Sequence, residues 1–330
     1  MIKHLRNVRK KLLKYTGLAA LILLLSNCEF VINFITQPLT ANAGEQITAV
    51  LDANFRINGG PYTKNIVIGI LAPRSWKLAQ NTTITYTSAK GPGTFKPIPP
   101  DVVAGNAKNG ENWTTIMKKK MGIGPNYIDD MEWVPFITTQ TISANNNDDI
   151  HAVFTIKMKV GVDGQNTSVR LGYVVCNDTD GLDDGSPYLW PFKFADCLEV
   201  KGAGDLIDFC NPSLSILNPV KALDNDYETI TFDNTVVNTE LKGQTDIYLC
   251  ATAHTSDGKD IAICTQDDRS KMIEAGANKF QIVIWPRQYF NLSAGQTITS
   301  VDYYFTNKAG NVKVGYGNTD APFKLRFVCD

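Results

Sequence analysis

The sequence contains few histidines, no paired-cysteine metal motif and none of the short motifs that mark common catalytic sites. Only three histidines occur in 330 residues, and C-x-x-C is absent, so the ligand spacing of a zinc site is missing. No G-x-S-x-G lies near His151 or His254, which leaves no activated hydroxyl nucleophile. A glycine-rich phosphate loop is also lacking. We therefore interpret both histidines as surface imidazoles, and we expect a protein that is not an enzyme and holds no organic cofactor.

Positive charge is not in excess either. The chain has 32 Lys and Arg against 33 Asp and Glu. Six of the basic residues and none of the acidic ones fall within residues 1–27, so the remainder carries a formal charge of −7. Nucleic-acid binding needs clustered positive charge, and adhesion to anionic lipid through a basic patch needs it too. The composition therefore argues against a nucleic-acid partner.

Long apolar runs are limited to one, near the N-terminus. Six basic residues come first: Lys3, Arg6, Arg9, Lys10, Lys11 and Lys14. The run that follows, Gly17–Leu25, has about nine residues, whereas a transmembrane helix needs roughly 20. A charged head, a short apolar centre and a small-residue exit are typical of a secretory signal peptide, which we place at residues 1–27.

This segment ends in Leu-Ser-Asn-Cys at residues 25–28, which resembles a bacterial lipobox. In that family the cysteine is acylated, with palmitate among its acyl chains, and becomes the mature N-terminus. The resemblance implies that Cys28 is lipidated and tethers the protein to outer-membrane lipid, because two or more acyl chains anchor a protein stably. The alternative is an ordinary signal peptide cleaved elsewhere, with Cys28 as a free thiol.

Six further cysteines all lie in the second half of the chain: Cys176, Cys197, Cys210, Cys250, Cys264 and Cys329. An even number in an exported protein indicates disulfides, and sequence alone does not choose among the connectivities. Local pairing is the simplest arrangement, and it predicts Cys197–Cys210 and Cys250–Cys264. Cys176 is then left to pair with Cys329.

Alternating apolar and polar residues dominate the mature chain and predict strands with one buried face. The predicted strands are 30–35, 46–55, 65–71, 82–87, 154–160, 169–175, 229–232, 247–252, 261–265, 279–285, 297–306, 311–316 and 323–329. One short helix is predicted at 112–121, ended by Gly122. Short strands with turn signals between them favour an all-β fold of two immunoglobulin-like β-sandwich domains in tandem. We place these domains at residues 28–204 and 205–330, divided at the Gly202-Ala203-Gly204 break.

The densest acidic loop spans residues 177–185 and is bent by glycines. Calcium takes six to eight oxygen ligands, which alternating carboxylates in such a loop can supply. The candidate ligands of a structural calcium ion are Asn177, Asp178, Asp180, Asp183 and Asp184. A solvated turn is the alternative, since Asp, Asn and Gly are common turn residues.

A second acidic group, Asp129, Asp130 and Glu132, lies beside Trp133. Glycoside hydrolysis uses two carboxylates a few ångströms apart. This group is therefore the basis of an alternative hypothesis, in which the protein is a carbohydrate-active hydrolase. The other alternative for these residues is a solvated loop.

Aromatic residues in the predicted loops provide candidate ligand contacts. Sugar rings present flat C–H faces that stack on aromatic rings, and nearby amides bind the hydroxyls. The candidate ligand-binding residues are Trp190, Trp285, Tyr289, Tyr316 and Asn318. The alternative is that these rings fill a sandwich core, as most aromatics do.

A family resemblance links these features. The lipobox, the β-sandwich pattern and residues 301–310 (VDYYFTNKAG) together resemble the accessory lipoproteins of Bacteroidota starch-utilisation-type loci. The mature chain is also similar to an uncharacterised lipoprotein family of such loci. The resemblance implies a non-catalytic, lipid-anchored protein, at the cell surface or on the periplasmic face, that holds a polysaccharide or oligosaccharide near an uptake receptor. A structural lipoprotein without a ligand is the remaining alternative.

Overall fold

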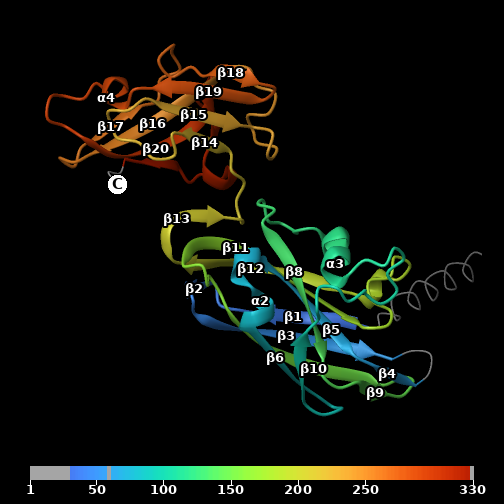
Figure 1. Cartoon of the computed structure of the whole chain (residues 1–330). Helices are drawn as coiled ribbons and strands as arrows, with labels where there is room; N and C mark the ends of the chain where they lie inside the picture. The colour runs from blue at the N-terminus through green and yellow to red at the C-terminus, as the bar shows by residue number, and fades with distance from the viewer. Residues whose placement is uncertain (1–29, 58–60, 328–330) are drawn as a thin grey trace, which may run out of the picture. The chain divides into compact units, whose positions relative to one another are not determined.

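The computed structural model describes residues 30–57 and 61–327, which form two compact β-rich units dividing between Cys210 and Asn211 (Figure 1). Each unit is an immunoglobulin-like β-sandwich with its own hydrophobic core, which confirms the predicted all-β class. The signal segment, Cys28 and Cys329 lie outside the described residues. Within the described part of the chain, no helix has the length and apolar character needed to cross a bilayer.

Two sheets face each other in the N-terminal unit. One contains β1, β3, β10 and β6 in that order, the other contains β8, β5, β11, β12 and β2, and β7 pairs with both β6 and β8. The strands are β1 (Phe30–Thr36), β2 (Thr40–Asn42), β3 (Gln46–Arg56), β4 (Tyr62–Lys64), β5 (Ile66–Pro73), β6 (Thr82–Ser88), β7 (Gly93–Pro97), β8 (Met131–Thr138), β9 (Ile142–Ala144), β10 (Asp149–Lys159), β11 (Gln165–Asn177), β12 (Phe192–Lys201) and β13 (Ala203–Asp208).

The predicted helix is α3 (Trp113–Met121), which packs against β8 and, through Met117, against Gly69 of β5. The Asn112 side chain caps it by accepting a hydrogen bond from the Thr115 N–H at 2.8 Å. A Cβ atom on Gly69 of β5 would approach Met117 Sδ to 2.6 Å, so the glycine allows close helix–strand packing. Strand β5 is therefore buried on both faces, as its continuous apolar run requires.

The predicted division at Gly202–Gly204 is displaced by the structure to Cys210. Gly202 lies between β12 and β13, Gly204 lies within β13, and β13 pairs in parallel with β11. The disulfide Cys197–Cys210 also ties the end of this segment back to β12. Both links hold residues 203–210 in the N-terminal unit, which a local Gly-rich signal does not reveal.

The C-terminal unit packs a four-stranded sheet against a five-stranded one. The first sheet has the order β14 (Ser215–Asn218), β15 (Glu228–Asp233), β19 (Lys279–Ile284) and β18 (Ile273–Gly276). The second contains β17 (Asp260–Ile263), β16 (Ile247–Thr255), β20 (Ile298–Asn307), β21 (Lys313–Val314) and β22 (Phe323–Arg326). Phe232 of the first sheet stacks on Phe305 of the second at 4.4 Å between ring centroids, and this contact lies in the core.

Short helical turns connect several strands in both units. They are η1 (Arg74–Trp76), α2 (Leu78–Asn81), η2 (Pro187–Leu189), α4 (Pro286–Tyr289) and η3 (Tyr316–Asn318). Of these, α4 follows β19 directly and begins with a proline, whose fixed φ suits the first helical turn. Strand β19 therefore ends at Ile284, and Trp285 is the N-cap residue of α4.

Candidate functional site

Two aromatic rings lie side by side on the surface of the C-terminal unit. Tyr227 immediately precedes β15, Trp285 immediately follows β19, and the pairing of Glu228 with Ile284 brings the two rings together. Their centroids are 6.2 Å apart and their planes are inclined at 35°. Tyr227 is 69% exposed and Trp285 is half-buried. We call these two residues the aromatic pair.

Polar groups surround the aromatic pair. The indole Nε1 of Trp285 donates to Asn225 Oδ1 at 3.3 Å, which orients the ring. Arg287 Nη1 lies 2.8 Å from Asp224 Oδ2, and the same carboxylate accepts the backbone N–H of Ile298. This arrangement fixes a flat ring beside amide, guanidinium and carboxylate groups, which is the combination that binds a sugar by stacking and hydrogen bonding.

The sequence identifies Trp285 but not Tyr227 or its polar neighbours. Tyr227 precedes a strand whose outward residues are threonines, and no local pattern marks its ring as exposed. Its position follows from the pairing of β15 with β19, two strands about fifty residues apart in the chain. A prediction that these two strands pair would have been needed to recognise that the two aromatic residues are neighbours.

Three other predicted ligand residues lie elsewhere in this unit. Tyr289 is 7% exposed and packs edge-on against Phe290, and burial raises the pKa of its hydroxyl. Its prediction as a surface contact is wrong, because α4 turns its ring into the core. Tyr316 is half-buried with its ring edge against Phe323, and Asn318 is exposed in η3 with a φ of 61°. The structure does not bring these residues to the aromatic pair.

Trp190 belongs to the N-terminal unit and is 9% exposed. Its Nε1 donates to the Asp183 carbonyl at 2.9 Å, and its ring stacks on Phe192 with an angle of 12° between their planes. The Lys120 ammonium lies 5.7 Å from the ring centroid. Trp190 therefore anchors the acidic loop to the sheet and offers little surface to a ligand.

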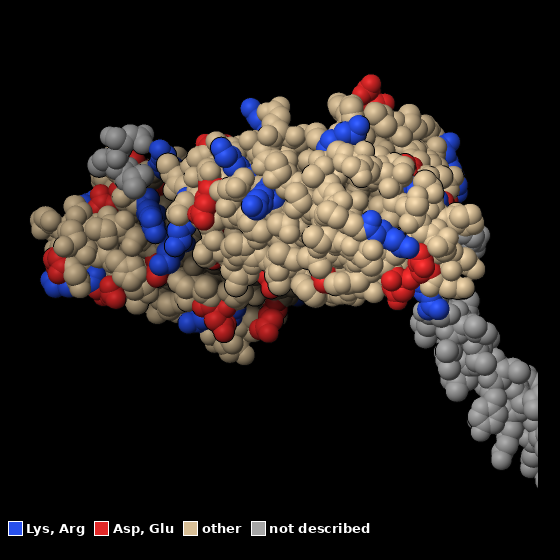
Figure 2. Space-filling model, turned by 90° about the horizontal axis from the view of Figure 1, so that it is seen from below, with Lys and Arg blue, Asp and Glu red and all other residues tan. Residues whose placement is uncertain are grey.

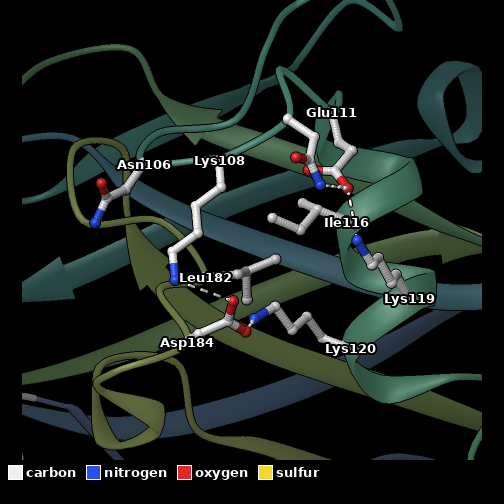
Figure 3. Close-up of a pocket in the computed structure, with 9 residues that line it drawn as sticks. Asn106, Lys108, Glu111, Ile116, Lys119, Lys120, Leu182 and Asp184 are labelled. Atoms are coloured by element: carbon white, nitrogen blue, oxygen red, sulfur yellow. Dashed lines mark hydrogen bonds and ion pairs between the residues drawn. The ribbon is translucent and has the colours of Figure 1, made fainter.

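A pocket of about 300 Å³ opens beside this loop, between α3 and residues 182–184 (Figure 3). Its lining residues are Asn106, Lys108, Asn109, Glu111, Ile116, Lys119, Lys120, Leu182 and Asp184. Lys108 and Lys120 both pair with Asp184, and Lys119 pairs with Glu111 at 2.8 Å. These mutual ion pairs neutralise most of the charge that the pocket presents.

The predicted calcium ligands are engaged in separate interactions. Asn177 Oδ1 accepts the backbone N–H groups of Thr179 and Asp180, and Asp178 accepts that of Asn65. Asp180 pairs with Lys64, and this contact together with Asn177 holds its pKa below the usual value despite partial burial. Across residues 30–57 and 61–327, no group of three or more His, Cys, Asp or Glu side chains is placed to hold a metal ion. The calcium site stays a prediction that this geometry does not favour.

The second acidic group lies at the start of β8. Asp129 contacts Lys118 at 2.5 Å, while Arg74 lies 3.6 Å from Asp130 and 4.0 Å from Glu132. Burial raises the pKa of Glu132, an effect that Arg74 opposes and Asp130 reinforces. Each carboxylate therefore has a cationic neighbour. Strand β8, which carries Glu132, was not among the strands predicted from the sequence.

His151 and His254 both contact aspartates. His151 Nε2 lies 2.8 Å from Asp52 Oδ2, and His254 Nδ1 lies 2.8 Å from Asp260 Oδ1. The hydrogen bond with Asp260 is the main cause that raises the pKa of His254. Both imidazoles reach the surface, which agrees with their interpretation as surface imidazoles.

The disulfides Cys197–Cys210 and Cys250–Cys264 are both formed, as predicted. The second joins β16 to the end of β17, because Ala251 pairs with Ile263 in the hairpin. Cys176 is a free, fully buried thiol, so its predicted pairing with Cys329 is wrong. It lies in the middle of the N-terminal core, and burial raises the pKa of its thiol.

On the face seen in Figure 2, basic and acidic side chains are interspersed across a largely uncharged surface. This view shows no large area of one sign, which is the distribution that the nearly balanced composition leads us to expect. Recognition on such a surface depends on local shape and hydrogen bonding more than on net charge.

The fold defines a protein built from two immunoglobulin-like β-sandwich units. The chain belongs to the family described as a domain of unknown function, DUF4961, which matches residues 30–213. A second domain of unknown function, DUF8578, matches residues 215–314. No curated protein matches the chain. The two family matches meet between residues 213 and 215, close to the division between the two compact units.

Several solved structures are similar at low scores. The C-terminal domain of the Streptococcus pyogenes antigen I/II-family protein AspA has a TM-score of 0.27 and 8% identity, covering 89% of this chain and 98% of its own. The group B streptococcus pilus 2b backbone protein has a TM-score of 0.24 and 12% identity, covering 88% of each chain. AvmM, which catalyses macrocyclization in alchivemycin A biosynthesis, has a TM-score of 0.30 and 11% identity over 55% of this chain and 94% of its own. Likeness at this level carries no argument about function.

Proposed function

We propose that this chain is a non-catalytic glycan-binding protein of the bacterial cell envelope. The observation that carries the proposal is the aromatic pair, Tyr227 and Trp285, on the surface of the C-terminal unit. An exposed ring on a sandwich face reduces solubility unless a ligand or partner covers it. The hydrogen bond from Trp285 to Asn225 also holds one ring in place before binding, which lowers the entropy lost when a sugar stacks on it.

The proposal includes the lipid anchor that the N-terminal segment implies. Cys28 would carry the acyl chains, tether the protein to the outer membrane and place it beside a glycan-uptake receptor. Anchoring raises the effective concentration of each site at the membrane, so that weak sites retain a long polymer. Mass spectrometry of the processed N-terminus tests this part of the proposal independently of binding.

The hydrolase alternative receives less support from the geometry. A retaining or inverting glycosidase needs two carboxylates that flank one bond. Asp129, Asp130 and Glu132 instead each lie near a lysine or arginine at the start of β8. We therefore favour binding over hydrolysis, and we expect no release of reducing sugar from any bound glycan.

Affinity electrophoresis against a panel of polysaccharides tests the proposed function. We expect at least one polysaccharide to retard the chain, and Trp285→Ala or Tyr227→Ala to weaken that interaction by about tenfold, which corresponds to the loss of one good stacking contact. Tyr304→Ala is the matched control, because Tyr304 lies on β20 with Lys313 near its ring, outside the aromatic pair. If no polysaccharide retards the chain, or if both variants bind as well as the unmodified protein, the proposal is wrong and a structural role becomes the better hypothesis.

A further inference from the structure

The aromatic pair stands at one end of a longer outward-facing surface. Alternate residues of β15 and β19 point away from the core, and the register pairs Thr229 with Val283 and Thr231 with Gln281. Because side chains alternate along a strand, these residues face the same side as Tyr227 and Trp285. The two neighbouring strands extend the surface sideways.

Strand β14 contributes Asn218 opposite Thr229 and Ile216 opposite Thr231. Strand β18 contributes Ile273 opposite Gln281. The three aliphatic residues are well exposed: Val283 is 56%, Ile216 is 49% and Ile273 is 62% accessible. A single uncovered face therefore combines threonine hydroxyls, amide groups and aliphatic patches.

This face is uncharged over most of its length. Its outward positions from Tyr227 to Thr231 and from Trp285 to Gln281 carry no ionisable side chain other than the tyrosine hydroxyl. The next outward positions along β15 and β19, beyond Thr231 and Gln281, are Asp233 and Lys279. These two charged residues pair with each other at 2.6 Å. At about 3.3 Å per residue, the six steps from Tyr227 to Asp233 span roughly 20 Å.

The chemistry of the face selects one class of occupant. An acidic chain would need cations along its path, and the nearest guanidinium, Arg287, is already paired with Asp224 at 2.8 Å. Hydroxyl and amide groups exchange hydrogen bonds with sugar hydroxyls, and exposed aliphatic side chains match the C–H faces of sugar rings. An exposed sheet face suits a chain that continues beyond the aromatic pair.

We infer that the outer face of the β14–β15–β19–β18 sheet binds an uncharged, unbranched glycan along β15 and β19, with one sugar on the aromatic pair. This inference rests on the proposed function and adds to it the charge and the length of the ligand. It assigns Thr231 and Gln281 as contacts for sugars remote from the aromatic pair.

Isothermal titration calorimetry on the full-length chain tests this. The probes are unbranched α- and β-glucan oligosaccharides, from disaccharide to octasaccharide, and oligogalacturonate of matched length. We expect affinity for one of the two glucan series to rise by about tenfold from disaccharide to octasaccharide. Oligogalacturonate should bind more weakly than the members of that glucan series. The double variant Thr231→Ala/Gln281→Ala should remove this rise and leave disaccharide affinity unchanged.

The matched control is Thr252→Ala/Ser300→Ala on β16 and β20 of the other sheet, which should preserve the rise. Affinity that does not depend on length, or a preference for oligogalacturonate, would overturn the inference. A tenfold loss of disaccharide affinity in Trp285→Ala would in that case still support the proposed function. Failure of every glucan and galacturonate to bind would instead count against the proposed function. Concentration-dependent dimerisation lost on Ile273→Lys would also overturn the inference, because a second copy would then cover the face.

Discussion

Glu228 carries a carboxyl group into the core of the C-terminal unit, one residue after the exposed Tyr227. Its side chain is fully buried in β15. Burial, reinforced by the nearby Asp226 carboxylate and partly offset by the backbone of Asn218, raises the pKa of Glu228 to about 7. The two neighbours in sequence thus have opposite environments, because consecutive strand residues face opposite sides of the sheet.

This residue predicts a pH dependence of stability. Between the ordinary glutamate pKa of 4.5 and about 7, the folded chain holds a proton that the unfolded chain has released. The free energy of unfolding therefore falls as pH rises through this window and levels off above it. Glu228→Gln should remove the fall and stabilise the C-terminal unit at pH 8 by on the order of 3 kcal/mol.

Urea denaturation followed at several pH values measures this effect. Glu274→Gln is the matched control, because Glu274 is exposed on β18 and its substitution should leave the slope with pH intact. A Glu228→Gln variant whose stability still fell between pH 5 and pH 7 would show that another group is responsible.

Single residues also show where sequence reasoning about ligand contacts fails. Trp285 and Tyr289 are four residues apart, and the sequence treats both as candidates of the same kind. The start of α4 at Pro286 turns the chain, so that Trp285 stays at the surface and Tyr289 enters the core. An aromatic side chain can occupy either a surface site or the core, so residue type does not distinguish the two positions. The direction in which the backbone points each Cα–Cβ bond decides which environment the ring enters.

At the scale of secondary structure, strongly periodic segments were predictable. Strand β10 alternates buried and exposed residues along most of its length, and this pattern is visible in the sequence as apolar and polar alternation. Strand β12 is different, because its residues from Phe192 to Cys197 are exposed or half-buried on both faces. Such a strand is held by pairing with a neighbouring strand, here β11. Its sequence shows little alternation of apolar and polar residues, so it is difficult to predict.

The helix α3 provides a prediction at this scale. Its N-terminus depends on Asn112, whose Oδ1 accepts the Thr115 N–H at 2.8 Å. Asn112→Ala should destabilise the N-terminal unit by about 1 kcal/mol, since one backbone donor loses its partner. Asn112→Asp retains an acceptor and should restore most of that loss in the same urea titration. Equal stability of all three proteins would mean that solvent satisfies the Thr115 N–H.

At the scale of the whole molecule, residues 30–57 and 61–327 contain two separate hydrophobic cores. One includes Leu51 of β3 and the other includes Leu249 of β16, and both side chains are almost inaccessible to solvent. Units with their own cores can unfold as independent cooperative transitions. The disulfides fit this division, because each one joins two cysteines of the same unit.

Calorimetry of two core variants tests this independence. Leu51→Ala and Leu249→Ala should each destabilise by about 2–5 kcal/mol, and each should lower the melting temperature of one transition only. A single transition that both variants lower together would show that the two units unfold cooperatively.

The sequence by itself indicated the β-rich class, the helix α3 and its end at Gly122, because each depends on periodicity or on residues close in the chain. It favoured the two local disulfides as the simplest pairing, and the structure confirms them. It also contained the division into two domains, although not its position. Tertiary structure alone decided that Cys176 is buried as a free thiol, that β13 stays with the first unit and that Tyr227 meets Trp285. Each of these outcomes depends on which strands distant in the sequence pair with each other. Many alternative pairings have similar local energies, and the native one is selected because it buries the apolar faces of all the strands in one core.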